Sequence, residues 1–313
     1  MTTTSRNPRL RGRAGFTLAE LVVALFLFTI IGTATTRVLI KQQQYYKDVN
    51  RSSSARRELR IGASVLPAEM RSISTSGGDI LSMSDSSITM FAYIGSSVIC
   101  ARTANTITVP PTNLSHHKLT SFVADPEQGD SVFLFDEGLL AGSEDDSWQA
   151  MGITAAPFQS MTACPGAPYT DPVLDPPALK HRLIYSLGPG NINDSVRVGA
   201  VVRFGRRVRY LIYQGSSGSF LGLQEMYGGA WESMQAMAGP YRPYVSGDGN
   251  PSGLQFRYYD TLGTRINDFT KTKDVGRIDV FLRTNAGKSA ITERKGALLR
   301  DSIVMRVAVR NSK

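Results

Sequence analysis

A long apolar run near the amino terminus constrains the fold of this chain more than any other feature. Between Phe16 and Thr36 the sequence has 21 residues and one charged side chain, Glu20. A helix of about 20 residues rises about 30 Å, the thickness of the hydrocarbon core of a bilayer. We therefore expect residues 16–40 to form a transmembrane helix.

The residues before the run set its orientation. Residues 1–15 contain four arginines and no acid: Arg6, Arg9, Arg11 and Arg13. Basic flanks remain in the cytoplasm, so we expect a cytoplasmic N-terminus with the bulk of the chain on the far side of the membrane. Because these arginines supply four of the nine positive charges of the net charge of +9, the charge of the whole chain does not indicate a nucleic-acid partner.

Two ordinary explanations of the run are a secretory signal peptide and a plain membrane anchor. A signal peptide has a shorter apolar core and a small-residue cleavage site, neither of which the sequence shows. A plain anchor explains the length and the flanking charge but not Glu20, because a charge costs about 2.5–3.5 kcal/mol at the centre of such a helix. The plain anchor remains the alternative.

The segment GFTLAE at residues 15–20, followed by LVVALFLFTIIG, resembles the type III signal of type IV pilins and type II secretion pseudopilins. The resemblance implies a leader, residues 1–15, that is cut off between Gly15 and Phe16. It also implies N-methylation of Phe16 and a pairing of Glu20 with the terminal amine of a neighbouring subunit. In a low-dielectric bundle this pair would attract strongly and set the axial register of the filament.

The same resemblance implies a fold, a location and partners. The fold would be α+β, with a long N-terminal α-helix packed on a large antiparallel β-rich globular domain. The chain would cross the inner membrane once, place its globular domain in the periplasm and then join a periplasmic or extracellular filament. Its partners would be the prepilin peptidase/methyltransferase, other pilin or pseudopilin subunits, the inner-membrane assembly platform and, before assembly, membrane lipid. We expect no enzymatic activity and no cofactor.

Residues 41–73 read as an amphipathic stalk that continues the same helix. Leu59, Ala63, Leu66 and Met70 step by 4, 3 and 4, which places them on one face. Pro67 is expected to bend the helix or end it within a turn. Tyr45, Val49 and Ser52 extend the stripe upstream.

The β-rich head is expected over residues 74–313, with an irregular insertion around 138–181. Segments 195–205 and 207–214 read as a hairpin with Gly205 in the turn, and 216–225 reads as a loop. Further strands are expected at 87–94, 97–100, 105–109, 131–137, 182–187, 253–260, 277–284 and 302–311.

Within the pilin-like superfamily, the chain resembles the larger minor subunits, namely the J-type pseudopilin and the W-type minor pilin. The similar segments are 59–71 at the helix end, Gly129-Asp130, LQFRYYDTLG at 254–263 and DSIVMRVAVRN at 301–311. Arg37 stands where many major pilins have a helix-kinking proline, which also favours a minor subunit. A membrane-anchored binding or adhesion protein and a DNA-uptake minor pilin are the alternatives.

Few residues suggest other chemistry. Cys100 and Cys164 form an even pair in an oxidising compartment, and either a disulfide or two buried thiols would fit. We expect no metal site and no catalytic residue. The residues that come nearest to a metal site are His116-His117. For calcium they are Glu144-Asp145-Asp146, and Asp248 with Asn250.

Overall fold

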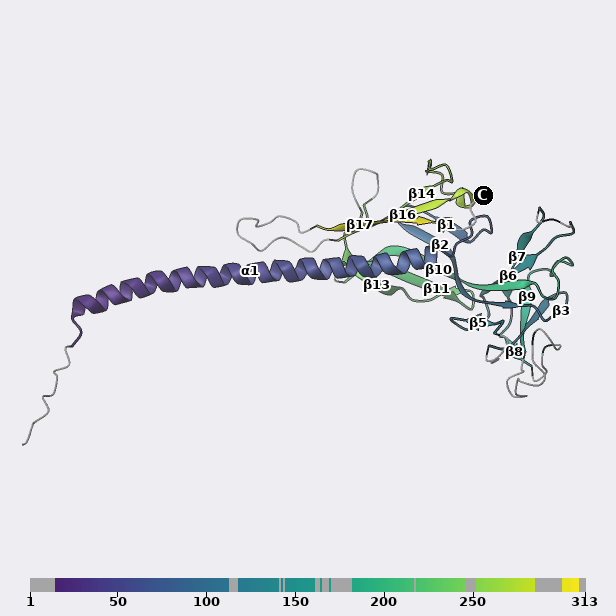
Figure 1. The fold of residues 1–313 in the computed structure, drawn as a ribbon, viewed down its shortest axis with the longest axis horizontal. Helices are drawn as coiled ribbons and strands as arrows, with labels where there is room; N and C mark the ends of the chain where they lie inside the picture. Colours follow the sequence, from purple (N-terminus) through teal and green to yellow (C-terminus); the bar gives the residue numbers. More distant parts are fainter. Residues whose placement is uncertain are drawn as a thin grey trace, which may run out of the picture. The chain divides into compact units, whose positions relative to one another are not determined.

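One long α-helix and two antiparallel sheets make up the described part of the chain (Figure 1). The chain divides into two compact units, residues 1–52 with 287–299 and residues 53–286 with 300–313. The computed structural model describes residues 15–112, 118–140, 142, 144–160, 164, 169, 182–216, 218–245, 252–284 and 300–309.

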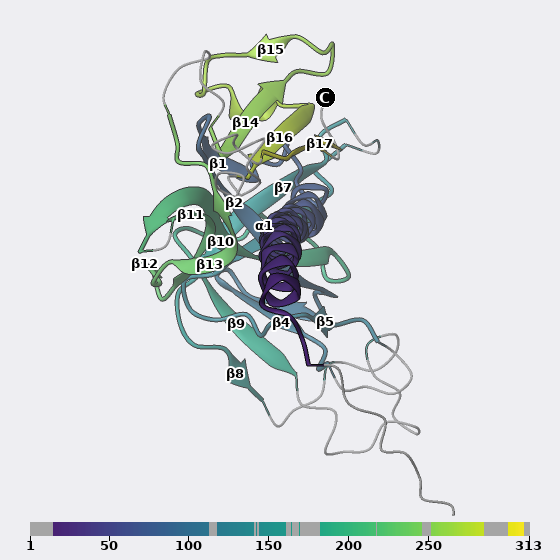
Figure 2. The same ribbon diagram turned by 90° about the vertical axis from the view of Figure 1, so that its left-hand side faces the viewer.

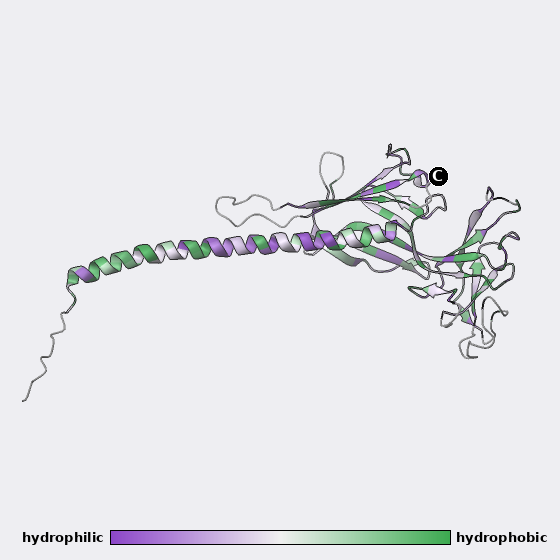
Figure 3. Ribbon diagram, viewed as in Figure 1, coloured by the Kyte–Doolittle hydropathy of each residue, from purple (hydrophilic) through white to green (hydrophobic). Residues whose placement is uncertain are grey.

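Helix α1 runs without interruption from Leu18 to Met70. Its first part is almost entirely apolar and its later part mixes polar and apolar residues (Figure 3). Pro67 lies in the last turn, where the amide of Arg71 donates to the carbonyl of Pro67 over 3.1 Å. The predicted end of the helix within a turn of Pro67 is therefore confirmed, because Met70 is its last residue.

The C-terminal part of α1 buries one face. Leu59, Leu66 and Met70 are 4%, 0% and 0% exposed and belong to one hydrophobic cluster, as the spacing predicts. Tyr45 and Val49, predicted to continue this stripe, are 59% and 43% exposed, and their place on the same face stays a prediction. Helical spacing places residues on one side of a helix but does not say how far along the helix that side is covered.

The larger sheet contains 13 strands, and all of its pairs are antiparallel. Its main path runs β1 (Ile80–Met83), β2 (Ser87–Val98), β10 (Val201–Gly215), β6 (Ser131–Asp136), β7 (Ser147–Ile153), β9 (Leu183–Gly188), β4 (Thr106–Val109) and β3 (Ala101–Arg102). Off this path lie β11 (Gly218–Tyr227), β12 (Ala230–Trp231), β13 (Gln235–Tyr241), β5 (Ser121–Phe122) and β8 (Phe158–Gln159).

A second sheet of four strands lies apart from the β11–β13 group (Figure 2). Its apolar residues alternate, and one face joins the cluster that receives α1. Its order is β15 (Arg265–Ile266), β14 (Leu254–Tyr259), β16 (Arg277–Arg283) and β17 (Ser302–Ala308), and the 3-10 turn η2 (Thr272–Asp274) precedes β16.

Three expectations about the head are wrong. The predicted hairpin of segments 195–205 and 207–214 is instead one strand, because β10 runs from Val201 to Gly215 through the predicted turn, and Gly205 pairs with Tyr93 and Ser131 within it. A Cβ at Gly205 would lie 3.1 Å from the ring of Phe133, so this glycine makes room for an aromatic neighbour instead of forming a turn.

The other two errors are missed strands. Residues 218–227, expected as a loop, form β11, which pairs with β10 from Gly218 to Glu225. Residues 147–153, expected within an irregular insertion, form β7, in which Met151 and Ile153 are buried. In both segments the tertiary contacts of a sheet override a composition rich in glycine and serine.

Two hydrophobic clusters form the core of the head, and β10 contributes to both of them. Val202 and Phe204 lie in one cluster, and Val208 and Tyr210 lie in the cluster that also contains the end of α1. Arg206, between these pairs, donates from Nε and Nη2 to the two carboxylate oxygens of Asp130 over 3.0 and 2.8 Å. The Arg206 and Asp130 side chains are 4% and 2% exposed, so this ion pair is buried and doubly hydrogen-bonded.

A second buried carboxylate joins the end of α1 to the sheet. Asp79 is fully buried, and its Oδ2 accepts hydrogen bonds from the Ser74 amide over 2.6 Å and the Tyr93 hydroxyl over 2.7 Å. Burial raises the pKa of Asp79, and these two bonds offset only part of that effect. A folded state that holds a proton more tightly than the unfolded chain loses stability as pH rises.

The free energy of unfolding of the Asp79→Asn variant should therefore increase relative to that of the wild type as pH rises from about 4 to about 7. The asparagine carbonyl can accept both hydrogen bonds without a buried charge. The measurement is the free energy of urea unfolding of both chains in detergent at each pH. Asp194→Asn, at an exposed position, is the matched control. A difference between Asp79→Asn and wild type that stays constant with pH would contradict the prediction.

Candidate functional site at the helix start

The segment GFTLAE forms the first turn of α1. Gly15, Phe16 and Thr17 precede the helix, which begins at Leu18. The Thr17 amide and hydroxyl both donate to Oε2 of Glu20 over 3.0 Å. In return, the Glu20 amide donates to the Thr17 hydroxyl over 3.2 Å. This reciprocal arrangement is a capping box, with Thr17 at the N-cap and Glu20 three residues later.

The capping box gives Glu20 a local reason to stand at this position. The first amides of a helix have no partner within the helix, and the helix dipole favours negative charge at this end. Because Thr17 holds one carboxylate oxygen against the first turn, the carboxylate is fixed in direction as well as in position along the chain.

Around this turn the helix presents an apolar surface. Phe16 is 89% exposed and Leu18 is 83% exposed. Among the described residues, α1 is the one helix long and apolar enough to cross a membrane by length and composition. The large apolar residues at 21–23, 25–28, 30 and 31 are also exposed. An apolar surface of this extent needs lipid or other helices around it.

The polar side chains within this apolar segment are satisfied by the helix itself. Between Leu18 and Thr36 they are Glu20 and four threonines. A hydroxyl bonded to its own helix backbone places no unsatisfied donor in the membrane. Each threonine hydroxyl donates over 2.7–2.8 Å to a backbone carbonyl three or four residues earlier. The pairs are Thr29 with the carbonyl of Phe26, Thr33 with that of Thr29, Thr35 with that of Ile31 and Thr36 with that of Gly32.

The residues predicted from the sequence for processing and assembly lie within six consecutive residues at the start of α1. Gly15 has open space around it, since a Cβ added there would meet no atom within 4 Å. Phe16 is exposed and Glu20 faces back towards Thr17. Thr17 is a functional residue of this turn without a predicted role, although the spacing T-x-x-E before an apolar run is the sequence signal of its capping function.

Glu20→Gln should preserve the helix start and Glu20→Ala should lose it, because glutamine can accept the same hydrogen bonds and alanine cannot. The measurement is hydrogen exchange at the Thr17 amide of the full chain in detergent micelles. Glu20→Ala should exchange about 2- to 30-fold faster than wild type, the effect of losing a cap. Equal exchange in Glu20→Ala and Glu20→Gln would mean that the cap does not order this turn.

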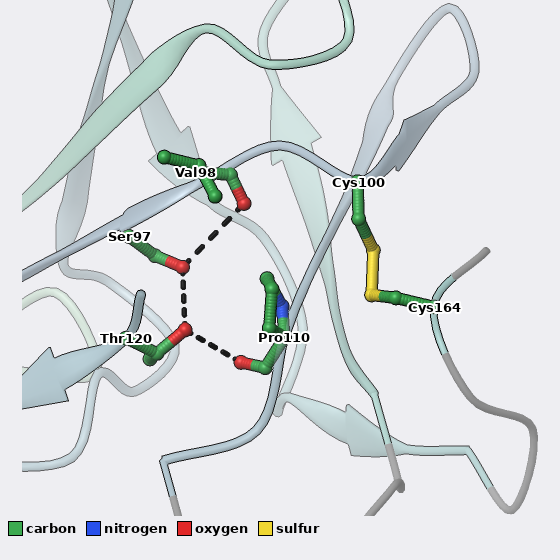
Figure 4. Close-up of a disulfide and its surroundings, with 6 residues drawn as sticks. All are labelled: Ser97, Val98, Cys100, Pro110, Thr120 and Cys164. Atoms are coloured by element: carbon green, nitrogen blue, oxygen red, sulfur yellow. Dashed lines mark hydrogen bonds between the residues drawn. A yellow bond between two sulfur atoms is a disulfide. The ribbon is translucent and has the colours of Figure 1, made fainter. Parts of the chain in front are cut away.

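A disulfide joins Cys100 to Cys164, with a Cα–Cα distance of 5.9 Å (Figure 4). Both cysteines are buried, at 2% and 3% exposure. Close by, the Thr120 hydroxyl donates to the Pro110 carbonyl and contacts the Ser97 hydroxyl, each over 2.6 Å. Cys100 follows strand β2, so the bridge fastens a segment 64 residues away to the end of a central strand.

Replacing both cysteines with serine should lower the free energy of unfolding of the head by about 4 kcal/mol, the loop-closure value for a loop of this length. The check is urea unfolding of the full chain in detergent under oxidising conditions. Adding a reductant should destabilise the wild type to a similar extent and leave the double serine variant unchanged. A double variant as stable as the oxidised wild type would contradict this expectation.

The acidic triplet at 144–146 has a structural use. Asp145 Oδ2 accepts the amides of Leu139 and Leu140 over 2.7 and 3.0 Å, which closes the turn between β6 and β7. These amide bonds lower the pKa of Asp145. Within the described residues, no group of three or more His, Cys, Asp or Glu side chains is placed to hold a metal ion. His116, His117, Asp248 and Asn250 lie outside the described residues.

Comparison with known proteins agrees with the geometry of the helix start. Residues 10–36 match the family model of the prokaryotic N-terminal methylation motif, a type IV pilin signature. No curated protein and no solved structure matches the chain. The motif supports processing by a prepilin peptidase and use of the chain as a subunit of a pilus or pseudopilus, in agreement with the long helix and the antiparallel β-rich head.

Proposed function

We propose that this chain is a minor pilin-like subunit, cut between Gly15 and Phe16, methylated at Phe16 and assembled through Glu20 into a type IV pilus or type II secretion pseudopilus. In this proposal residues 1–15 are the leader, 16–40 the membrane and assembly helix, 41–73 the stalk and 74–313 the head. The precursor spans the inner membrane with its head in the periplasm. It acts in the initiation or tip complex and has no catalytic activity of its own.

The observation that carries the proposal is a fixed carboxylate in an apolar segment that lacks any other charge. In a plain anchor, a capped helix start would serve as well with asparagine or glutamine in place of a charge. A charge is useful if an opposite charge arrives, and removal of the leader creates one at the amine of Phe16. Both groups then lie at the apolar end of a helix, where an amine–carboxylate pair is strong and an unpaired charge is costly.

Two features support a minor role. Helix α1 has no proline before Pro67, and Arg37 stands in the segment where a proline would kink it. The head has two hydrophobic clusters among its described residues, which suits contacts specific to one position in a filament. A membrane-anchored binding or adhesion protein, or a minor pilin for DNA uptake, would share the anchor and the head.

Processing and assembly can be separated with three variants expressed beside a prepilin peptidase and partner subunits. Gly15→Leu should block cleavage, so that mass spectrometry finds residues 1–15 retained. Glu20→Gln and Glu20→Ala should be cleaved and methylated but be absent from the sheared filament fraction. Glu20→Gln is the decisive variant because it keeps the cap and removes only the charge.

The controls separate the charge from the cap. Thr17→Val removes the capping hydroxyl and keeps the carboxylate, so it should still assemble, at a reduced level. Asp194→Asn, in the head, should assemble as wild type does. An uncut wild-type chain would refute the proposal. A wild-type chain that is absent from the filament fraction would favour the plain anchor, and normal assembly of Glu20→Gln would refute the role proposed for the Glu20 charge.

A further inference from the structure

The outer face of the four-stranded sheet carries a cluster of arginines, which we name the arginine face. In β14 and β16 the even-numbered residues point into the hydrophobic cluster, so the odd-numbered residues point away from it. Cross-strand register places Arg257, Asp279 and Arg306 in one row, with Asp279 in the middle. The arginine face comprises Arg257, Arg277, Arg283 and Arg306.

One carboxylate, Asp279, lies in the central strand among these four arginines and forms ion pairs with two of them. Asp279 lies 3.0 Å from Nε of Arg277 and 3.9 Å from Nε of Arg306. Like charges on neighbouring positions of a sheet face are destabilising, so an excess of three positive charges is costly without an anion. Burial lowers the pKa of Arg283, and the charges of Arg257 and Arg242 lower it further, which is the sign of crowded positive charge.

Aromatic rings hold the arginines in place. The guanidinium carbons of Arg257 and Arg283 lie 4.6 and 5.0 Å from the ring centre of Phe281, and that of Arg277 lies 4.1 Å from the ring centre of Tyr259. A guanidinium that rests on a ring loses less side-chain freedom on binding. Nη1 of Arg283 also donates to the Ser252 carbonyl over 2.8 Å. The Arg306 side chain remains 76% exposed.

The spread of the charges favours a polymeric anion over a small one. From Arg277 to Arg283 strand β16 advances about 20 Å, and adjacent strands add about 5 Å each across the face. Over about 20 Å a strand of B-DNA presents about six phosphates. Arginine forks match phosphate oxygens in pairs, and all four cations of this face are arginine.

We propose that the arginine face binds the phosphodiester backbone of nucleic acid. Whole-chain charge does not reveal this surface, because the leader arginines dominate the charge asymmetry and the four face arginines are spread over 50 residues of sequence. Binding of nucleic acid by the head does not require assembly. A chain that assembles but does not bind nucleic acid would refute this proposal alone, and a chain that binds but does not assemble would refute the proposed subunit function alone.

The test is binding of a fluorescent duplex of about 20 base pairs to the full chain in detergent over a range of salt concentrations. Four phosphate contacts predict a slope of log affinity against log salt between about −3 and −4. Arg306→Gln should make the slope shallower by about one, and Val304→Arg, which adds a charge on the same face, should make it steeper by about one. Both positions are exposed, so both variants are expected to fold.

Matched controls place the same charge changes elsewhere on the head. Val201→Arg is a suitable partner for Val304→Arg because the two valines are 45% and 47% exposed. Arg197→Gln removes an exposed arginine outside the arginine face. Neither control should change the slope, and the leader, shared by all variants, does not affect the comparison.

Three results would overturn the proposal. Controls that shift the slope as much as the face variants would show general attraction by net charge. Polyglutamate that displaces the duplex at equal charge concentration would indicate an acidic protein partner. Vesicles of anionic phospholipid that bind more tightly than the duplex, and lose that binding in Arg306→Gln, would indicate a membrane surface.

Discussion

Helix α1 has to suit two surroundings, an apolar one around its first part and the strands of the head around its last turns. The rest of the structure depends on this constraint. Up to Thr36, α1 carries one charged side chain, and its large apolar residues are exposed within the described part of the chain. From Leu59 onward the helix is apolar on one face, and the strands of the head cover that face. A chain built in this way is incomplete alone: it needs lipid first and, in the proposed function, the helices of other subunits afterwards.

The sequence predicts the parts of the fold that are set locally. The apolar run, the spacing of Leu59, Leu66 and Met70 and the end of the helix near Pro67 all depend on residues within a few turns of each other. The prediction fails where distant residues decide. Gly205 is a turn former by type, but its place beside Phe133 in the middle of a sheet makes it part of a strand.

The same distinction separates what was found at the candidate site from what was missed. Gly15, Phe16 and Glu20 could be named from a contiguous motif, and the cap from Thr17 was equally visible in the T-x-x-E spacing. The arginine face was not visible in this way. Arg257, Arg277 and Arg306 meet only because β14, β16 and β17 pair in one register, and a slip of one residue would turn each arginine to the other side of the sheet.

The link between Cys100 and Cys164 has a consequence for the resistance of the head to proteolysis. The covalent loop encloses β3 to β8, including the turn between β6 and β7 and other exposed connections that a protease would reach first. A single cut within that loop divides the chain but leaves both pieces in one covalent molecule. Since β6 and β7 also remain hydrogen-bonded into the larger sheet, a head that has been cut once within this loop can keep its fold.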